Sequence, residues 1–545
     1  MQENLKGECC TLMAKINGIN TIYKRIITNI RTNMKQILII MFVLVFNHYL
    51  VYYRTNFLLD LLYVSYAVVI EIGVLLLVST FVGRYGRLIY ALFFILASFD
   101  FALNFGNYLC TKELFTYDSF LLIMGTNSQE TSDFLQSYFS IEKIILWVTT
   151  LILLYVVYFS YRFKITIKEK GTKILIIIGL SISLLGCATL RYTFFANLFP
   201  GKYIHFMYLY EPITDLSEYR QSVKIEETTK KHPSKIMVII GESFAKSHSS
   251  IYEYEKETNP KLATLMKSKN LYSFTHCEAP ATRTTLAFKC IMSTYCTSKS
   301  TEKKWYECIT LNDVFQPMYE MYWISNQKNS GTYNCVQSYY ANLCDSVWFS
   351  NEEIGQMDCY DEVLLPIIHS LKKANKENKK KPSLVIVNLM GQHEAFWLRY
   401  PNKWEHYREL DYLDKPQKQR KALASYDNAT LYNDYIVYSI IQQYKDENAI
   451  IFYFPDHGLD LYETDESFFG HAQLISSKSV EISRQIPFFI YVSDSYKQSQ
   501  PLEIDKIEKS LSKPFNTENF IYSLMDIVGY RFADNDDVET YSLFR

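Results

Sequence analysis

Long apolar stretches are concentrated in the first two hundred residues of this 545-residue chain. Five stretches are long enough to cross a bilayer core of about 30 Å, which takes roughly 20 apolar residues in a helix. They cover residues 36–53, 58–82, 88–105, 142–160 and 174–195. The first follows a basic arm, as a signal peptide would, but four further stretches follow it and it lacks a small-residue cleavage site. The pattern therefore predicts a membrane bundle of five transmembrane helices.

The basic residues predict how this bundle is oriented, because Lys and Arg are retained on the cytoplasmic side of a membrane. With five spans, three basic segments fall on one side: the arm of residues 1–35, the loop with Arg84 and Arg87, and the loop with Arg162, Lys164, Lys168, Lys170 and Lys173. The chain after the fifth span is then expected outside, in the periplasm if the cell is a Gram-negative bacterium.

Two further segments belong to this half of the chain. The predicted transmembrane domain, residues 36–195, includes an outer loop at 106–141, in which Thr126 and Glu130 stand four residues apart. That spacing places both on one face of a helix, and the residues alone favour a solvated surface helix. Residues 196–233 are rich in Tyr and Phe with interspersed charge, which is typical of a linker lying along the bilayer surface.

From about Ser234 the pattern changes to short apolar runs that alternate with longer amphipathic stretches. This alternation is typical of an α/β domain with a mostly parallel central sheet, predicted here over residues 234–545. The expected strands include the runs at residues 235–240, 383–388, 450–454 and 486–491.

Three of these runs end in residues that can bind a metal ion. Glu242 follows the first run, His393 lies just beyond the second, and Asp456 and His457 follow the third. Ligands of open α/β sheets bind at the carboxyl ends of the strands. An isolated Asp-His-Gly also occurs in ordinary turns, but three strands that end in this way favour a site. Glu242, Asp456 and His457 supply the carboxylates and the imidazole that zinc accepts.

A transfer reaction at such a site also needs a nucleophile. The stretch from Cys277 to Cys290 contains three hydroxyl side chains, Thr282, Thr284 and Thr285, at an expected junction between a loop and a helix. Free backbone N–H groups and the helix dipole favour a phosphate at that position. Thr is also a common helix cap, so the residues alone leave the choice among the three open.

Charge and cysteine content narrow the class of protein. The 56 Lys and Arg residues balance 57 Asp and Glu, which gives no overall case for binding nucleic acid. Seven of the 11 Cys lie between Cys277 and Cys359, in the part predicted to be outside, where disulfides can form. Proximity makes Cys277/Cys290, Cys296/Cys308 and Cys335/Cys344 plausible pairs and leaves Cys359 over, although sequence alone does not fix the connectivity.

An ordered set of short motifs runs across most of residues 234–495. The set comprises Gly241-Glu-Ser243, Ile251-Tyr-Glu-Tyr254, Thr258-Asn-Pro260, Cys290-Ile-Met-Ser293, Trp323-Ile-Ser-Asn-Gln327, Met390-Gly-Gln-His393, Arg399-Tyr-Pro401, Tyr426-Asp-Asn428, Asn433-Asp-Tyr435 and Pro455-Asp-His-Gly458. Together these motifs resemble the phosphoethanolamine transferases of the bacterial envelope, which modify lipid A or the lipopolysaccharide core. That family belongs to the alkaline phosphatase/sulfatase superfamily, and the predicted five-span topology agrees with it.

The resemblance implies roles for individual residues. It makes Glu242, Thr284, Asp456 and His457 the zinc ligands, with Thr284 also the nucleophile, because Thr284 lies six residues before Cys290 as the family's nucleophilic Thr precedes its disulfide Cys. His393 and His471 match family histidines that contact the phosphoryl group, stabilise the leaving group or hold a second zinc. Thr126 and Glu130 match a periplasmic-loop pair implicated in binding the headgroup of the donor lipid.

The activity implied by the resemblance is zinc-dependent transfer of phosphoethanolamine from phosphatidylethanolamine to a lipopolysaccharide acceptor, either lipid A or the core. The reaction would pass through a covalent intermediate on Thr284. The chain would be a monomeric, multi-pass protein of the inner membrane with its catalytic domain in the periplasm.

Three alternatives remain open on the sequence. A phosphoglycerol transferase would use the same zinc and threonine. A sulfatase-like hydrolase would need a C/S-x-P/A-x-R motif, and Cys277-Glu-Ala-Pro280 with Arg283 has the residue types at the wrong spacing. A membrane protein without catalytic activity could use the domain to bind envelope glycolipid, but such a protein is expected to have lost ligands.

Overall fold

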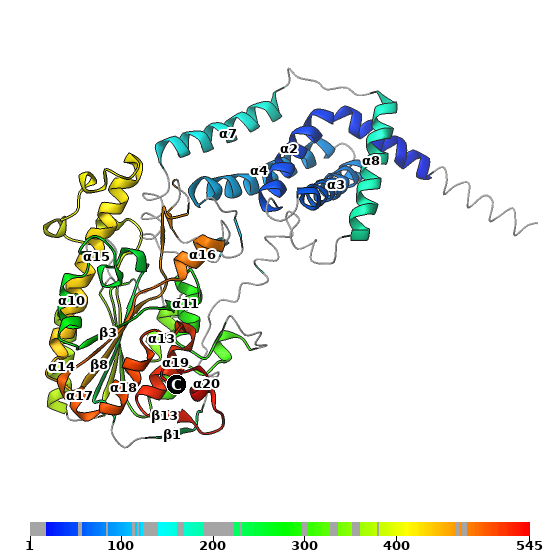
Figure 1. Cartoon of the computed structure of the whole chain (residues 1–545). Coiled ribbons are helices and arrows are strands. Elements are labelled where there is room, and N and C mark those ends of the chain that lie inside the picture. The colour runs from blue at the N-terminus through cyan, green and yellow to red at the C-terminus, as the bar shows by residue number, and fades with distance from the viewer. Residues whose placement is uncertain are drawn as a thin grey trace, which may run out of the picture. The chain divides into compact units, whose positions relative to one another are not determined.

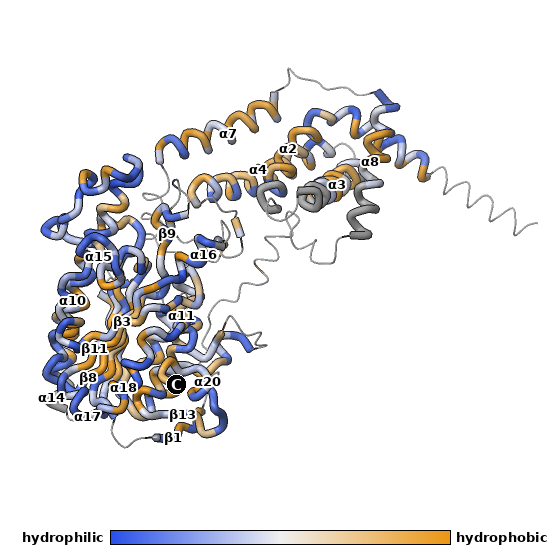
Figure 2. Tube along the Cα trace, in the orientation of Figure 1, coloured by the Kyte–Doolittle hydropathy of each residue, from blue (hydrophilic) through white to orange (hydrophobic). Residues whose placement is uncertain are grey.

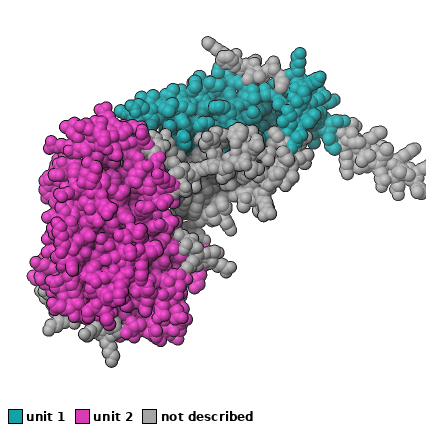
Figure 3. Space-filling view, viewed as in Figure 1, with its two compact units in different colours: residues 1–124, 139–211 teal, residues 125–138, 212–545 magenta. Residues whose placement is uncertain are grey.

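The structure is a computed structural model, and the chain divides into two compact units (Figure 3). Residues 1–124 and 139–211 form the first unit, and residues 125–138 and 212–545 form the second. The described residues are 18–52, 57–82, 85–111, 115–116, 119–120, 123, 140–160, 168–189, 207, 220, 222–228, 232–296, 303–327, 336–350, 360–378, 381–464, 466, 469–470 and 477–545.

The first unit is helical, and one helix overlaps each of the five predicted apolar stretches. These helices are α2 (Met34–Tyr52), α3 (Phe57–Val82), α4 (Gly86–Thr111), α7 (Ile141–Phe159) and α8 (Glu169–Thr189). A further helix, Gly18–Thr32, precedes α2. It is bent by 79° relative to Met34–His48, which is the first part of α2.

Not all of these helices have the length and composition of a membrane span within the described residues. Gly86–Cys110 and Ile141–Phe159 do, and a third span results if the bent pair is taken as one. Figure 2 shows α4 and α7 as apolar along most of their length. The structure thus supports an apolar helical unit, while the number of five spans stays a prediction.

Buried polar side chains join helices inside this unit. His48 Nε2 of α2 lies 3.1 Å from Glu71 Oε2 of α3. Asn47 Nδ2 of α2 donates to Asp100 Oδ2 of α4 at 2.9 Å. Such pairs between helices are expected in an apolar environment, because a polar group there needs a partner within the protein.

The second unit is built on a seven-stranded sheet whose strand order is β3-β11-β8-β2-β7-β5-β6 (Figure 1). The strands are β2 (Lys235–Gly241), β3 (Leu271–Phe274), β5 (Glu320–Ser325), β6 (Ser346–Phe349), β7 (Ser383–Asn388), β8 (Ala449–Pro455) and β11 (Phe488–Val492). The five neighbouring strands β8, β2, β7, β5 and β6 pair parallel with one another. The predicted strands at 235–240, 383–388, 450–454 and 486–491 are all present.

One strand runs antiparallel to the others in a sheet that the sequence predicted to be mostly parallel. β11, which contains most of the apolar run at 486–491, pairs antiparallel with both β8 and β3, so the sheet is mixed. Both orientations give the same apolar run when a strand is buried, so the run cannot distinguish them. The antiparallel orientation means that the chain re-enters the sheet at the end where it left β8. The connection between β8 and β11 therefore begins and ends at the carboxyl end of β8.

Helices cover both faces of the sheet, as the alternation of side chains along β2 requires. Met237 and Ile239 pack in a core with α10 (Pro260–Lys267), α14 (Leu364–Asn378) and α15 (Gln417–Tyr444). Ile236, Val238 and Ile240 pack in a second core on the opposite face. Its helices are α11 (Thr284–Ile291), α12 (Leu311–Phe315), α13 (Val336–Asn342), α17 (Asp494–Ser499), α18 (Pro501–Ser510), α19 (Phe520–Ile527) and α20 (Asp537–Tyr541).

Three short pairs of strands and one more helix complete the described strands and α-helices of this unit. β1 (Ile225–Glu227) pairs with β13 (Tyr530–Phe532), β4 (Cys277–Glu278) with β12 (Phe515–Asn516), and β9 (Asp460–Leu461) with β10 (Phe469–Gly470). α16 (Ser477–Arg484) lies in the connection between β8 and β11.

Ile239→Ala is expected to destabilise the second unit by about 2–5 kcal/mol, because it leaves a cavity in the middle of a fully buried strand. Thermal unfolding of the purified chain, followed by circular dichroism, measures this as a lower melting temperature. Leu502→Ala is the matched control, since Leu502 is 73% exposed at the start of α18. Equal melting temperatures for both variants would contradict the assignment of Ile239 to the core.

Candidate metal centre and nucleophile

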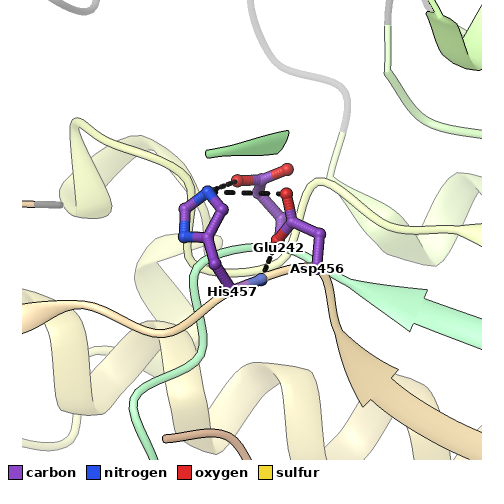
Figure 4. A group of neighbouring side chains, drawn as sticks. All are labelled: Glu242, Asp456 and His457. Carbon is purple, nitrogen blue, oxygen red and sulfur yellow. Dashed lines mark hydrogen bonds and ion pairs between the residues drawn. The ribbon is translucent and has the colours of Figure 1, made fainter. Parts of the chain in front are cut away.

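Three predicted ligands converge at the carboxyl ends of two neighbouring strands. Glu242 directly follows β2, and Asp456 and His457 directly follow β8. One ligand atom from each residue lies within 4.8 Å of the others, and all three residues are buried (Figure 4). Two buried carboxylates and an imidazole at this spacing form a donor set that suits a divalent cation.

The orientation of the His457 ring suits a metal ligand. Its Nδ1 lies 2.8 Å from the carbonyl oxygen of Gly458, and a carbonyl only accepts, so Nδ1 carries the proton in the neutral ring. The remaining nitrogen, Nε2, lies 3.5 Å from both Glu242 Oε1 and Asp456 Oδ2. A backbone carbonyl that fixes the ring in this way is a common support for a metal-bound histidine.

The two carboxylate oxygens of Asp456 have different surroundings. Its Oδ1 accepts hydrogen bonds from the backbone N–H of Ser243 at 3.2 Å and of His457 at 2.8 Å. Its Oδ2 is buried and has no hydrogen-bond partner among the residues that the structure describes. A buried carboxylate oxygen without a donor is costly, and a bound cation removes that cost. The residues present therefore fit a metal ion.

Thr284 lies beside these ligands at the first position of α11. Its Oγ1 is 3.4 Å from Glu242 Oε1 and 3.3 Å from His457 Nε2. Of the three threonines that the sequence left open, Thr284 makes these contacts, whereas the Thr285 side chain is exposed and Thr282 is buried. The structure thus brings Thr284, Glu242, Asp456 and His457 together.

The pKa shifts at the centre arise from burial and from the charges of its two carboxylates. Burial raises the pKa of Glu242, and the nearby Asp456 raises it further. Burial lowers the pKa of His457, but Asp456 and Glu242 together outweigh that effect, so the pKa is raised overall. A raised pKa means that each group binds a proton, and its positive charge, more readily. A bound cation supplies positive charge at the same place.

His393 lies next to the centre, in the loop after β7. It is half-buried, and its Nδ1 is without a hydrogen-bond partner among the described residues. Burial lowers the pKa of His393 to about 4, so its imidazole is neutral near pH 7. The other predicted site residues, Thr126, Glu130 and His471, lie outside the described residues.

Of three buried or half-buried side chains that the sequence did not assign to the site, one binds Glu242 directly and two hold backbone segments next to it. Gln327 donates from Nε2 to Glu242 Oε2 at 3.0 Å. The Tyr426 hydroxyl donates to the carbonyl of Ser243 and accepts from the N–H of Ala245, both at 2.7 Å. Asp361 accepts hydrogen bonds from the N–H groups of Met390 and Gly391. Gln327 and Tyr426 belong to the quoted motifs, but their partners are far away in sequence.

The cysteine pairs suggested by proximity are not formed. Cys277, Cys308 and Cys344 are free thiols, so none of the pairs Cys277/Cys290, Cys296/Cys308 and Cys335/Cys344 is present. A disulfide needs Cα atoms about 4.4–6.8 Å apart with Cβ atoms that face each other. Closeness in sequence does not ensure this geometry, because Cys277 lies in β4 and Cys290 near the end of α11. Cys335 and Cys359 lie outside the described residues.

Comparison with protein families gives a match that lies within the second unit of the chain. A family model described as sulfatase matches residues 234–530, which is more than half of the chain. This chain belongs to the sulfatase family. The matched region covers the seven-stranded sheet and all four residues of the centre.

Several relatives of this sulfatase domain are phosphoethanolamine transferases, which confirms the resemblance found in the motifs. The phosphoethanolamine transferase EptC of Escherichia coli strain K12 is 24% identical over 466 residues, covering 79% of this chain and 78% of that protein. The phosphoethanolamine transferase EptA of Helicobacter pylori is 28% identical over 282 residues, covering 49% of each chain.

Two solved structures share the fold. The integral membrane lipooligosaccharide phosphoethanolamine transferase A of Neisseria meningitidis has a TM-score of 0.61 at 16% identity and covers 93% of this chain and 95% of its own. The periplasmic domain of Escherichia coli EptC in complex with Zn has a TM-score of 0.52 at 22% identity and covers 62% of this chain and 90% of its own. The predicted fold class, a helical region followed by an α/β domain of this superfamily, is confirmed apart from the mixed sheet and the number of spans.

Gly391→Ala is expected to weaken zinc binding at least tenfold, or about 1.4 kcal/mol. Gly391 has a φ of +50°, and an added Cβ would lie 2.8 Å from the backbone nitrogen of Glu242. The substitution therefore displaces a ligand without removing one. Competition with a fluorescent chelator on the purified chain measures the affinity. Gly73→Ala is the control, because its added Cβ meets nothing within 4 Å; equal affinities for both variants would show that Gly391 does not position Glu242.

Proposed function

We propose that this chain transfers phosphoethanolamine from phosphatidylethanolamine to a lipopolysaccharide acceptor, lipid A or core, through a covalent intermediate on Thr284. The observation that carries the proposal is the position of Thr284 Oγ1, 3.3 Å from His457 Nε2 and 3.4 Å from Glu242 Oε1. Similarity to proteins named phosphoethanolamine transferases supports the reaction class. The zinc complex of a domain with the same fold supports the choice of metal.

Glu242, Thr284, Asp456 and His457 would hold the zinc ion. Bound zinc supplies a Lewis acid that lowers the pKa of a hydroxyl and offsets charge on phosphoryl oxygens. Thr284 Oγ attacks the phosphorus of the donor, an O–P bond forms, and the bond from phosphorus to the diacylglycerol oxygen breaks. The proton of the Thr284 hydroxyl ends on diacylglycerol. The acceptor hydroxyl or phosphate then attacks the same phosphorus, the bond from phosphorus to Thr284 Oγ breaks, and the acceptor's proton restores the Thr284 hydroxyl.

Other residues act on the phosphoryl group in this proposal. Thr284 begins a helix of eight residues, so the N–H groups of its first turn can donate to phosphoryl oxygens. His393 has a pKa of about 4 and is neutral near pH 7, which lets its imidazole donate a hydrogen bond to the leaving oxygen. His471 is proposed to share this role with His393, or to hold a second, transient zinc with it.

The membrane arrangement belongs to the same proposal. Residues 1–35 form a cytoplasmic arm, residues 36–195 a five-span domain of the inner membrane, and residues 196–233 a linker on the bilayer surface. Thr126 and Glu130, in the outer loop at 106–141, bind the donor headgroup. Residues 234–545 form a periplasmic catalytic domain, and the chain acts as a monomer. Donor and acceptor are both lipids, which gives a physical reason for joining the enzyme to a membrane.

Incubation with phosphatidylethanolamine is expected to leave a phosphoethanolamine group on Thr284, which peptide mass spectrometry detects directly. Thr284→Ala abolishes the adduct because it removes the attacking oxygen. Thr285→Ala is the matched control and retains the adduct, since Thr285 is the exposed next residue.

The same experiment separates the competing functions. An adduct that survives in Thr284→Ala contradicts the assignment of the nucleophile. A phosphoglycerol transferase carries phosphoglycerol on the same residue when given phosphatidylglycerol instead. A sulfatase-like hydrolase or a glycolipid-binding protein without activity leaves no phosphoethanolamine on the chain.

Removal of zinc is expected to abolish adduct formation, and added zinc to restore it, because the threonine hydroxyl is a poor nucleophile without the metal. Asp456→Asn should neither retain zinc nor recover, since it replaces a ligand. Asp460→Asn is the control: Asp460 is also buried, but it accepts hydrogen bonds from the backbone N–H of Glu463 and the Ser479 hydroxyl. Metal analysis of the purified variants checks this, and an Asp456→Asn chain with full zinc content would refute the ligand set.

A further inference from the structure

Exposed large apolar side chains are scarce in the second unit, and most of them gather in one region. Five are exposed among its described residues: Trp348, Trp397, Leu410, Leu413 and Leu502. Three of the five fall between residues 397 and 413, and Leu410 and Leu413 are 74% and 64% exposed. A lone exposed leucine is ordinary, whereas a group of this kind beside basic residues points to an interaction surface.

This surface is held in a defined shape by buried hydrogen bonds. Leu410 belongs to the short helix η10 (Glu409–Tyr412), and the buried Tyr412 hydroxyl donates to Asp427 of α15. The N–H groups of His406 and Tyr407 donate to Asn428 Oδ1 at 2.9 and 2.7 Å. The exposure of Leu410 and Leu413 is thus built into the fold, because the backbone on either side of them is anchored.

Basic side chains border the leucines and the tryptophan. Residues 415–421 contain Lys415, Lys418, Arg420 and Lys421 and no acidic residue. Arg420 Nη2 donates to the carbonyl of Leu413 at 3.2 Å, and Lys421 Nζ lies 5.9 Å from the centre of the Trp397 ring. These contacts place the basic segment next to both the backbone of Leu413 and the ring of Trp397.

Two of the four acidic residues in the same segment, Asp411 and Asp414, have partners close by in the sequence. Asp411 Oδ2 accepts from the N–H of Arg408 at 2.7 Å, and Asp414 Oδ2 lies 3.3 Å from Lys415 Nζ. Glu405 and Glu409 are exposed. From Lys403 to Lys421 the chain carries six basic and four acidic residues, and the four basic residues after Asp414 give the surface its positive edge.

The surface lies at the same end of the sheet as the metal centre. Trp397 follows Phe396, whose ring is 5.0 Å from that of Tyr426, and Tyr426 bonds to Ser243 beside Glu242. The yellow segment before α15 lies at one end of the unit and α17 and α18 lie at the other (Figure 1). The remaining exposed leucine, Leu502, belongs to α18 and therefore lies at the opposite end.

We propose that Trp397, Leu410 and Leu413 insert into the interface of a lipid bilayer that carries anionic headgroups, with Lys415, Lys418 and Lys421 on those headgroups. Leucine and tryptophan partition into the boundary between headgroups and acyl chains, and nearby lysines attract anionic lipid. The contact brings the centre end of the catalytic unit to the surface that holds lipid substrates. This inference goes beyond the proposed function, and its test needs no turnover.

The test places a photoreactive residue at the surface. The full chain with Leu410→p-benzoylphenylalanine, in nanodiscs of phosphatidylethanolamine and phosphatidylglycerol, is irradiated and analysed by mass spectrometry. We expect lipid adducts at position 410 and, in a second variant, at 413. Leu502→p-benzoylphenylalanine is the matched control, as exposed and at the far end. A Thr284→Ala background separates the outcome from transfer, because docking does not require the nucleophile.

Each outcome decides the proposal. Lipid adducts at 410 and 413 but not at 502 support it, and a drop of about fivefold when phosphatidylglycerol is omitted supports the role of the lysines. The proposal is overturned by any of three results: equal labelling at 502, no lipid adduct at 410 and 413, or crosslinks from these positions to a second copy of the chain. Labelling that is indifferent to phosphatidylglycerol overturns the preference for anionic lipid.

Discussion

The second unit is organised by two buried carboxylates that face each other across the ends of β2 and β8. Glu242 and Asp456 repel each other in a medium of low polarity, and His457 alone does not remove that cost. A cation at their meeting point does. The surrounding residues keep the ligands from separating, because Asp456 Oδ1 is tied to Ser243 and Glu242 is held by Gln327. The backbone at Ser243 has a φ of 56°, a conformation unfavourable for a side chain other than glycine and one that this network maintains.

A single helix, α15, connects the centre to the rest of the catalytic end. Three consecutive residues in its first half each fix a different segment. Tyr426 holds residues 243–245, Asp427 accepts hydrogen bonds from Tyr254 and Tyr412, and Asn428 holds residues 406 and 407. Because α15 is packed along one face of the sheet, the positions of the ligands and of the exposed leucines are set by the same rigid element. His248, which lies 2.6 Å from Asp427, belongs to this scaffold as a satisfied core residue.

The path of the chain also determines which segments lie beside the metal centre. Because β11 is antiparallel to β8, the connection between them begins and ends at the site end of the sheet, and its described residues include β9, β10 and α16. On the neighbouring side, α11 begins with Thr284, so the hydroxyl and the free N–H groups of the first helical turn lie together beside the ligands. The proposed nucleophile, the candidate cation site and a helix N-terminus thus occupy one corner of the sheet. A phosphoryl group requires this combination during transfer.

The sequence alone predicted the helical first unit, four of the seven strands of the sheet and the positions of Glu242, Asp456 and His457 at strand ends. These features depend on neighbours along the chain: apolar runs of a given length and polar residues where such runs end. The remaining features depend on contacts between segments that are distant in the sequence. The tertiary structure set the orientation of β11, singled out Thr284 by contact and left the cysteine pairs unformed. It also placed Gln327, Asp361 and Tyr426 around Glu242, although Tyr426 and its partner Ser243 are 183 residues apart. Hydrogen bonds of this kind leave no periodic trace in a sequence, because either partner alone is compatible with many folds.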